Sequence, residues 1–311
     1  MNRLAGIIVA ALGLIVAVIS ILKVIPGFSL TGTGVLMLVT GGAMIGLSFV
    51  SKPLTEGVER MSTGSSLINI FVAPAEVFQN LRRHPRWLIA VLIMAILSSV
   101  YTNLFVERLT VERVANYTID KTLEMPMIAN SDQATQQVES GRAKAVEDAK
   151  NPVNRIGQAI NGFLGIVLLN CVLAGIFLLF ALAMGGSLNF WQAFAAAVYA
   201  AFPVSIIRFV LNTVILYIKD PTDIHPIRGQ SSLIQDNLSF LVTPADHPVI
   251  FSFLAALGLL WFYWTWLNAT GLKNAGERVS GSTAWTAALA IYGILVLFGV
   301  VLSWAFPSFI S

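Results

Sequence analysis

One arginine lies within a long apolar run, and its position makes it the side chain of this chain most suited to bind a ligand inside a membrane. Arg208 occurs in the stretch AAFPVSIIRFVLNTVILYI, four residues before Asn212. Residues four apart share one face of a helix, so the guanidinium and the amide are predicted to point the same way. Ionisable side chains at membrane depth often mark functional sites. The favoured interpretation is a snorkelling or packing arginine, with an anion or lipid-headgroup site as the alternative.

Pro203 lies five residues before Arg208 in the same run. Proline removes a backbone hydrogen bond, so a kink is predicted. Broken helices can build substrate sites in transporters, but a kink that serves packing is commoner. No acidic residue lies within any apolar run, so Arg208 is expected to lack a countercharge at membrane depth. Its predicted partners are backbone carbonyls, a lipid phosphate, water, or an asparagine of another helix: Asn161, Asn170 or Asn268.

Enzymatic chemistry has no recognisable pattern in this sequence. Neither HExxH nor GxSxG is present, and the apolar runs lack the Asp, Glu or His of a proton relay. One polar cluster outside the runs flanks prolines, so solvated turns are expected there rather than a metal site. Its members are Asp220, Asp223, His225, Asp246 and His247. We predict that the protein is not an enzyme and holds no metal or cofactor.

The composition requires that the helices carrying these residues face lipid. Of 311 residues, 56% are hydrophobic and 11% are charged, whereas soluble domains carry about 25% charged residues. A membrane-spanning helix needs about 20 mainly apolar residues. Seven runs qualify, namely 4–24, 34–50, 87–106, 160–184, 190–218, 249–267 and 284–306.

The distribution of basic residues predicts the orientation of these spans. Basic residues concentrate on the side of the N-terminus, at Arg3, Lys52, Arg60, Arg82, Arg83, Arg86, Lys273 and Arg278. On the other side, the loop 107–158 holds seven basic and eight acidic residues and has no basic bias. Since basic residues favour the cytoplasm, the N-terminus is predicted to be cytoplasmic and the C-terminus exterior.

Two polar loops lie on the predicted exterior side. In 107–158, a helix is expected from Ser131 or Asp132 to the stop at Asn151 and Pro152, with a solvated face. The loop 219–248 is predicted either to form a lid or to lie on the membrane.

The first two spans form a predicted hairpin, residues 1–58, with a turn at Pro26 and Gly27. Small residues four apart allow helix backbones to approach closely. The pairs that suggest this packing are Gly6 and Ala10, Gly13 and Ala17, and Gly42 and Gly46.

The stretch APAEVFQNLRRHPRW, residues 73–87, is flanked by prolines and directly precedes the third span. Apolar residues recur with helical spacing, which predicts an amphipathic helix over 67–84 lying at the membrane surface. Phe78 is expected in the membrane, and Arg82 and Arg83 among anionic headgroups, each contributing about 1 kcal/mol. The segment would act as an orienting anchor or as a docking surface for a partner protein.

Three stretches resemble the Yip1-domain family of membrane proteins. They are APAEVFQNLRRHPRW, then GGSLNFWQAFAAAVYAAFPVSI with its Tyr-x-x-x-Pro at Tyr199 and Pro203, and FLAALGLLWFYWTWLNATGLKNAGERVSGSTAWTAALAIYG. The resemblance covers about 67–306 and implies a five-span module with a cytoplasmic N-terminus. Eukaryotic members are linked to vesicle trafficking through small GTPases, whereas some bacterial-type members are labelled permeases. Val198 replaces a glycine common before the tyrosine, and the acidic-aromatic stretch of eukaryotic members is missing, so this chain resembles the bacterial type.

Together these patterns predict an all-α bundle of about seven spans in a cell (inner) membrane. The predicted domains are the hairpin 1–58 and a Yip1-like core, 59–311. A non-enzymatic scaffold or adaptor is the favoured function, and a channel or transporter for a small anionic solute is the alternative. The expected partners are the bilayer, anionic headgroups and an unidentified protein, with no nucleic acid.

Overall fold

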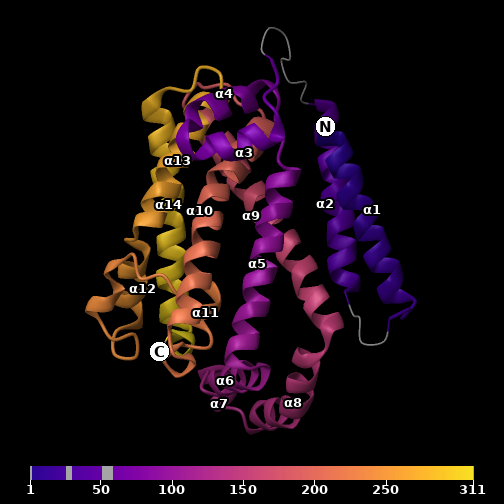
Figure 1. Cartoon of the computed structure of the whole chain (residues 1–311), viewed down its shortest axis with the longest axis vertical. Coiled ribbons are helices and arrows are strands. Elements are labelled where there is room, and N and C mark those ends of the chain that lie inside the picture. The colour runs from indigo at the N-terminus through magenta and orange to yellow at the C-terminus, as the bar shows by residue number, and fades with distance from the viewer. Residues whose placement is uncertain (1, 26–29, 51–58, 311) are drawn as a thin grey trace. The chain divides into compact units, whose positions relative to one another are not determined.

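A computed structural model describes residues 2–25, 30–50 and 59–310, and in these ranges the chain folds into helices without a strand (Figure 1). The all-α class is therefore confirmed. Pro26, Gly27 and Lys52, used above for the hairpin turn and the orientation, lie outside the described residues.

Six helices are long and apolar enough to cross a membrane within the described ranges. They are α1 (Asn2–Ile21), α2 (Thr31–Val50), α5 (Leu88–Leu109), α9 (Pro152–Ala183), α10 (Phe190–Ile218) and α14 (Gly281–Ala305). The remaining predicted span, 249–267, is wrong as a continuous helix. It is replaced by α12 (Pro248–Ala256) and α13 (Leu259–Ala275), which are bent by 50° at a short break.

The chain divides into two compact units. Unit 1 comprises Met1–Ile96, Ile156–Ser205 and Tyr263–Ile291, and unit 2 comprises Leu97–Arg155, Ile206–Phe262 and Tyr292–Ser311. The boundaries between the two units fall within α5, α10, α13 and α14, and close to the start of α9.

In unit 1, α1 and α2 pack along small residues, although not all of those expected. Gly34 and Gly41 of α2 lie so close to α1 that a Cβ atom would collide with backbone atoms of Ala17 and Ala10. Gly42 and Gly46, which had been predicted to make this contact, face open space. The glycine spacing therefore predicts the close packing of α1 and α2 correctly. Of the four glycines of α2 named here, only Gly34 and Gly41 contact α1.

The predicted helix over 67–84 is two helices, α3 (Thr63–Val72) and α4 (Pro74–Arg83). Ala73 separates them with an extended φ of −138°, and Pro74 occupies the first turn of α4. The residue before a proline disfavours helical geometry, which explains the break. The Ser62 hydroxyl accepts a hydrogen bond from Ser65 N and starts α3 four residues earlier than predicted.

In unit 2, the polar loop after α5 folds into α6 (Val111–Leu123), α7 (Pro126–Ala129) and α8 (Asp132–Lys150). The predicted α8 is confirmed at both ends, since Ser131 caps its first turn and it stops before Asn151. Two ion pairs join α8 to α6: Arg142 with Asp120 at 2.7 Å and Lys150 with Glu112 at 2.5 Å.

The loop 219–248 also belongs to unit 2 and carries η1 (Pro221–Asp223), α11 (Arg228–Ser231) and η2 (Leu238–Leu241). Its first half is folded onto the protein: Ile224 is buried in a cluster with Phe105, Leu109 and Leu216. The Tyr101 hydroxyl donates to the Gly229 carbonyl at 2.6 Å. A layer lying wholly on the membrane is therefore excluded for this half of the loop.

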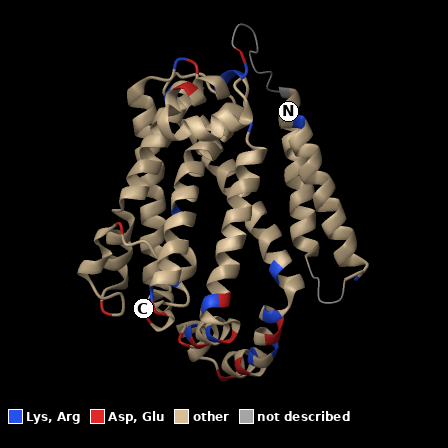
Figure 2. Cartoon of the chain, viewed as in Figure 1, with Lys and Arg blue, Asp and Glu red and all other residues tan. Residues whose placement is uncertain are grey.

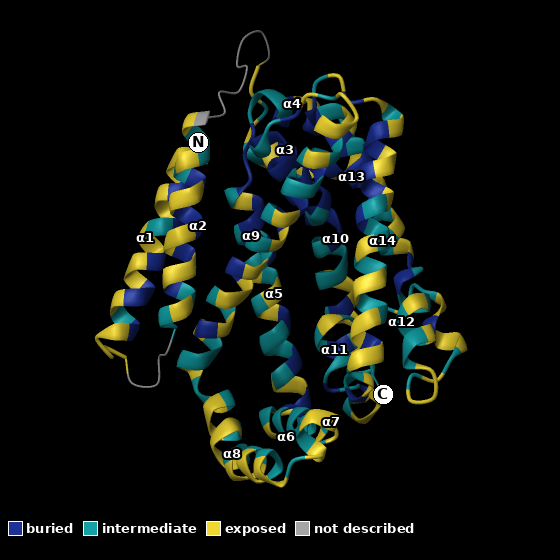
Figure 3. Cartoon of the chain, turned by 180° about the vertical axis from the view of Figure 1, so that it is seen from behind, coloured by how far each residue is buried: buried dark blue, intermediate teal, exposed yellow. Residues whose placement is uncertain are grey.

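In the six long apolar helices, charged side chains other than Arg208 lie near the helix ends, and the others gather in the polar segments between these helices (Figure 2). The helices α2, α12 and α14 contain none. Many exposed side chains of α1, α2 and α14 are apolar instead, as the exposed positions in Figure 3 show. Long helices with apolar exposed faces belong in lipid, so the chain is a multi-pass membrane protein. η3 (Pro307–Phe309) follows the last long helix.

Candidate functional site

Phe78 does not have the lipid-facing position predicted for it. Its side chain is fully buried in unit 1, and an added Cβ at Gly271 would lie 3.1 Å from the ring. Val77 and Leu81 are buried beside it in the sequence. The apolar face of α4 is therefore covered by protein, so Phe78 is a packing residue and is inaccessible to a docking partner.

Arg82 is held within unit 1. Its guanidinium forms an ion pair with Glu277 at 2.9 Å, in the turn between α13 and α14. The amide of Gln192 donates to the Arg82 carbonyl at 3.0 Å, and Gln79 donates to Asn274 at 3.2 Å. The neighbouring Arg83 is half-buried and adds to the positive potential on Glu277. The predicted headgroup contacts of the pair remain predictions, but one guanidinium already has a carboxylate partner.

Arg86 is the arginine of this segment that organises the fold, and the sequence pattern did not single it out. The side chain is 3% exposed and donates to the Met61 carbonyl, to Ser66 Oγ at 2.5 Å and to Asn80 Oδ1 at 3.1 Å. It also interacts with the Tyr199 hydroxyl, and burial lowers the pKa of its guanidinium.

These contacts join α3, α4 and α10 through one side chain. The next residue, Trp87, is buried edge-on against Phe194 of α10, with ring centroids 5.1 Å apart. Two features of the sequence could have indicated this role. Arg86 lies beside Trp87 at the start of a span, and its partner Tyr199 is the tyrosine of the Tyr-x-x-x-Pro pattern. The arrangement is structural, because its two terminal nitrogens are already bonded to protein.

Pro203 and Asn212 both lie in α10, and both are buried. The helix continues through Pro203 over Phe190–Ile218, so the predicted kink remains a prediction. The Oδ1 atom of Asn212 accepts hydrogen bonds from Leu233 N at 2.8 Å and from Ser232 Oγ at 3.5 Å. Asn212 therefore holds the loop 219–248 against α10.

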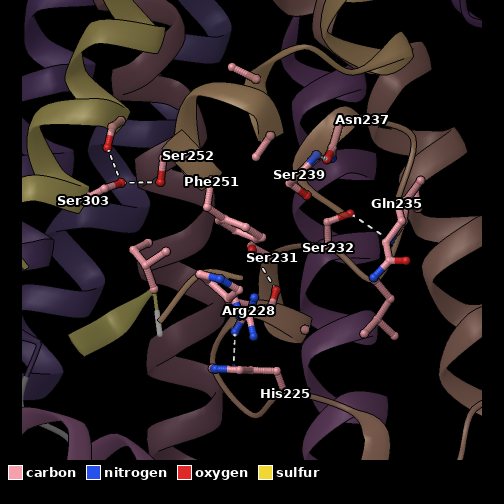
Figure 4. A pocket seen from close by; sticks show the side chains of 18 of the residues that line it. His225, Arg228, Ser231, Ser232, Gln235, Asn237, Ser239, Phe251, Ser252 and Ser303 are labelled. Atoms are coloured by element: carbon pink, nitrogen blue, oxygen red, sulfur yellow. Dashed lines mark hydrogen bonds between the residues drawn. The ribbon is translucent and has the colours of Figure 1, made fainter. Parts of the chain in front are cut away.

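Arg208 lines a cavity of about 1070 Å³ that is formed entirely by unit 2. None of the three asparagines proposed as its partners lines this cavity. Asn161 accepts from Thr33 at 2.7 Å, and the Nδ2 groups of Asn170 and Asn268 donate within their own helices. The polar lining comes mainly from the loop 219–248, as Figure 4 shows (Figure 4). These residues include Lys219, Asp223, His225, Arg228, Ser231, Ser232, Gln235, Asp236, Asn237 and Ser239.

Two arginines of the cavity each lie over an aromatic ring. The guanidinium carbon of Arg208 lies 5.9 Å from the centroid of Trp261, and that of Arg228 lies 5.3 Å from Phe251. Such cation–π contacts hold a guanidinium without using its N–H donors. The Nε atoms of both arginines are buried and have no hydrogen-bond partner among the residues that the structure describes.

The apolar runs supply no acid for Arg208, but the loop 219–248 folds back and brings Asp236 into the same cavity. The Asp236 carboxylate attracts Arg208 electrostatically. The same carboxylate caps α13, with Oδ2 accepting from Leu260 N at 2.8 Å. A carboxylate at a helix N-terminus is favourable, and here it stabilises the start of the second half of the broken span.

Backbone groups on both sides of the break between α12 and α13 form hydrogen bonds with other parts of unit 2. The carbonyl of Asp236 accepts from Leu259 N at 3.2 Å, and the Tyr292 hydroxyl donates to the Ala256 carbonyl at 3.0 Å. At Gly258 an added Cβ would lie 3.0 Å from Asp236 Oδ1, so a larger residue would require the carboxylate to shift slightly. Ala255, Ala256, Leu260 and Trp261, on either side of the break, line the cavity.

His225 fixes the polar wall of the cavity. Its Nδ1 accepts from the backbone N–H groups of Ile227 and Arg228, both at 3.2 Å, and its Nε2 lies 3.2 Å from the Tyr117 hydroxyl. Arg113 of α6 donates to the Pro221 carbonyl at 2.6 Å. In the described parts of the chain, no group of three or more His, Cys, Asp or Glu side chains is placed to hold a metal ion.

A Yip1 domain profile matches residues 68–305. No curated protein and no solved structure gives a significant match to the chain. The matched region starts in α3 and ends at the last residue of α14, and so includes Arg86 with all of its side-chain partners except Met61 and Ser66, as well as most of the cavity lining. The chain therefore belongs to the Yip1 domain family.

Proposed function

We propose that this membrane protein binds a small anionic solute in the cavity of unit 2 and moves it across the membrane as a permease. The observation that carries the proposal is the pair Arg208 and Arg228, which line one cavity and are each held on an aromatic ring. A guanidinium that is fixed in place but retains free N–H donors suits recognition of a carboxylate or phosphate.

The broken span supports this function. Irregular backbone at membrane depth is tolerated where it is buried in protein or lines a cavity, and transporters build substrate sites from interrupted helices. The break at Leu257 and Gly258 is sealed by protein groups, and residues on both sides of it line the cavity. Asp236 provides an internal countercharge for Arg208 that an incoming anion can replace.

Flux measurements in proteoliposomes test the proposal. Radiolabelled chloride, acetate and phosphate are compared with rubidium as a cation control. We expect flux of at least one anion, reduced about tenfold or more by Arg208→Gln or Arg228→Gln at equal protein content, because each removes one charge-assisted contact. Arg142→Gln removes a cation of the same unit outside the cavity and is the matched control. Equal fluxes with the wild type, the cavity variants and empty liposomes would contradict the function.

The orientation that goes with this function follows the basic residues. The N-terminus and the α3–α4 segment are cytoplasmic, and the C-terminus is exterior, in the inner membrane of a cell. Single cysteines introduced at Glu76 and at Glu139 into a Cys171→Ser background, labelled with a membrane-impermeant maleimide, test this. Labelling of Glu139→Cys alone in intact cells is expected, and labelling of Glu76→Cys alone would reverse the orientation.

A scaffold remains a second candidate, and the rigidity of the α3–α4 segment favours it. Arg86 and Asn80 tie both helices to the rest of unit 1, which would present a preorganised surface. The exposed side chain for a photocrosslinker is Glu76, because Gln79 is bonded to Asn274. A stoichiometric protein captured in native membranes, and lost when Arg82 and Arg83 are both changed to Glu, would support the scaffold. Capture of lipid alone would reject it.

A further inference from the structure

We infer that the ligand of the cavity is an amphiphile, with one oxyanion head and one apolar chain. This inference rests on the anion site proposed above and adds the chemistry of the rest of the ligand. The relevant observation is that the lining of the cavity is divided into a polar wall and an apolar wall, with the two arginines at their junction.

The polar wall is built by the loop 219–248, which includes α11, and by Arg208 of α10. It provides two fixed guanidinium groups and several hydroxyl groups, including Ser231, Ser232 and Ser239. Arg228 is positioned by its ring contact with Phe251 and by the bond from its backbone N–H to His225. Guanidinium and hydroxyl donors together match the acceptor oxygens of a phosphate or carboxylate head.

The apolar wall is built by α12, α13 and α14. Its side chains include Leu260, Leu295, Val296 and Leu302, with Phe306 directly after α14. Two serines of this wall, Ser252 and Ser303, are hydrogen-bonded to each other. Phe251 and Trp261, which carry the arginines, belong to the same wall, so each cation lies where the polar lining meets the apolar lining. If the head of a ligand lies at these two cations, the rest of the ligand contacts an apolar surface that contains no charged side chain.

The volume leaves room for more than a small ion. Pockets for drug-sized ligands have volumes of roughly 300–1,000 Å³. At about 1070 Å³, this cavity would remain largely unfilled by inorganic phosphate or acetate. An acyl or alkyl chain would fill the apolar part and remove the side chains of α12–α14 from water.

Native mass spectrometry of the full-length protein in a neutral detergent tests the inference. The probes are inorganic phosphate, butyl phosphate, dodecyl phosphate and uncharged dodecanol, titrated separately. We expect one dodecyl phosphate per chain, bound at least about tenfold more tightly than butyl phosphate, because eight further methylenes are buried while the micelle competes for the chain. Arg228→Gln should weaken dodecyl phosphate binding about tenfold or more, whereas Arg142→Gln should leave it unchanged.

The possible outcomes separate this inference from the proposed anion site. If butyl phosphate binds as tightly as dodecyl phosphate and both depend on Arg228, the anion site stands and the amphiphile is rejected. If dodecanol binds as tightly as dodecyl phosphate, the anionic head is rejected. If no phosphate binds, both proposals fail. Leu295→Trp is a second variant that fills the apolar wall and keeps both arginines, and it should weaken dodecyl phosphate selectively.

Discussion

Two arginine sites of this molecule, Arg86 in unit 1 and Arg208 with Arg228 in unit 2, are buried in different ways. The terminal nitrogens of Arg86 donate to a carbonyl, a hydroxyl and an amide of the protein. Arg208 and Arg228 are held by aromatic rings and line a cavity. The difference shows that burial alone does not mark a binding residue. The Nε atoms of all three arginines are buried without a hydrogen-bond partner among the described residues, so the difference lies in the terminal nitrogens, which Arg86 uses within the protein.

The largest expected effect comes from removing the hydrogen bonds of Arg86. Arg86→Gln cannot reach all three acceptors, and buried acceptors left without donors cost about 1–3 kcal/mol each, so we expect a loss of roughly 3 kcal/mol of stability. Thermal unfolding of the detergent-purified protein and its yield in membranes measure this. Lys273→Gln, a change at an exposed position of α13, is the control and should leave both thermal unfolding and yield unchanged. An Arg86→Gln protein as stable as the wild type would show that the site is not a structural clamp.

Asp236 sharpens the comparison, because it is the carboxylate that opposes Arg208. Asp236→Asn keeps an oxygen for Leu260 N while removing the charge. We expect binding of dodecyl phosphate to tighten about tenfold, the equivalent of about 1.4 kcal/mol, since the anion no longer competes with a carboxylate. Binding is measured by native mass spectrometry. Unchanged or weaker binding would mean that Asp236 does not oppose the ligand.

Asn212 tests whether the wall of the cavity depends on its link to α10. Asn212→Ala leaves Leu233 N without its acceptor, so we expect a loss of about 1 kcal/mol, concentrated in the loop 219–248. Hydrogen exchange of residues 229–236 should increase while that of α6 and α8 stays constant. Asn170→Ala is the matched control, because Asn170 is also buried but bonds only within its own helix. Equal effects of the two variants would contradict the assigned role.

The smallest expected effect is the pH dependence of the ion pair in unit 1. The hydrogen bond from Arg82 lowers the pKa of the Glu277 carboxyl below its ordinary value. The ionised Glu277 carboxylate therefore contributes its full stabilisation at pH values above the ordinary pKa of a glutamate. This contribution is lost as the pH falls through the lowered pKa. The two side chains are 31% and 35% exposed, so solvent screening limits the contribution to at most about 1 kcal/mol. On acidification, the wild type should lose slightly more stability than Glu277→Gln, and equal losses would contradict the pair.

Long apolar runs and local capping signals were sufficient to predict six spans and α8. The break in the remaining span was not predictable, because Leu257 and Gly258 lie in apolar sequence and their partners, Asp236 and Tyr292, are distant in the chain. Helical spacing also identified the apolar face of α4 correctly. It could not show whether lipid or protein covers that face, and for Phe78 the answer is protein.

The candidate site was predicted in part. Arg208 stood out because it is charged within an apolar run, and Asn212 followed from its spacing. Arg228 gave no signal, since a charged residue in a polar loop normally faces solvent. Only the folding of the loop against α10 and α12 brings it into the cavity. Arg86 was equally hidden among the basic residues of its segment, because sequence does not distinguish a buried guanidinium from one at the surface.

The contacts of α4 with the end of α13 and the turn that follows it can form only late in synthesis. Gln79 and its partner Asn274 are 195 residues apart. At roughly 5–20 residues per second, ribosomes need about 10–40 seconds between making the two. During that interval the polar face of α4 is complete but has no turn to pair with. A chain truncated before Asn274 would keep this face uncovered permanently, which gives cellular quality control a feature that distinguishes unfinished from finished copies.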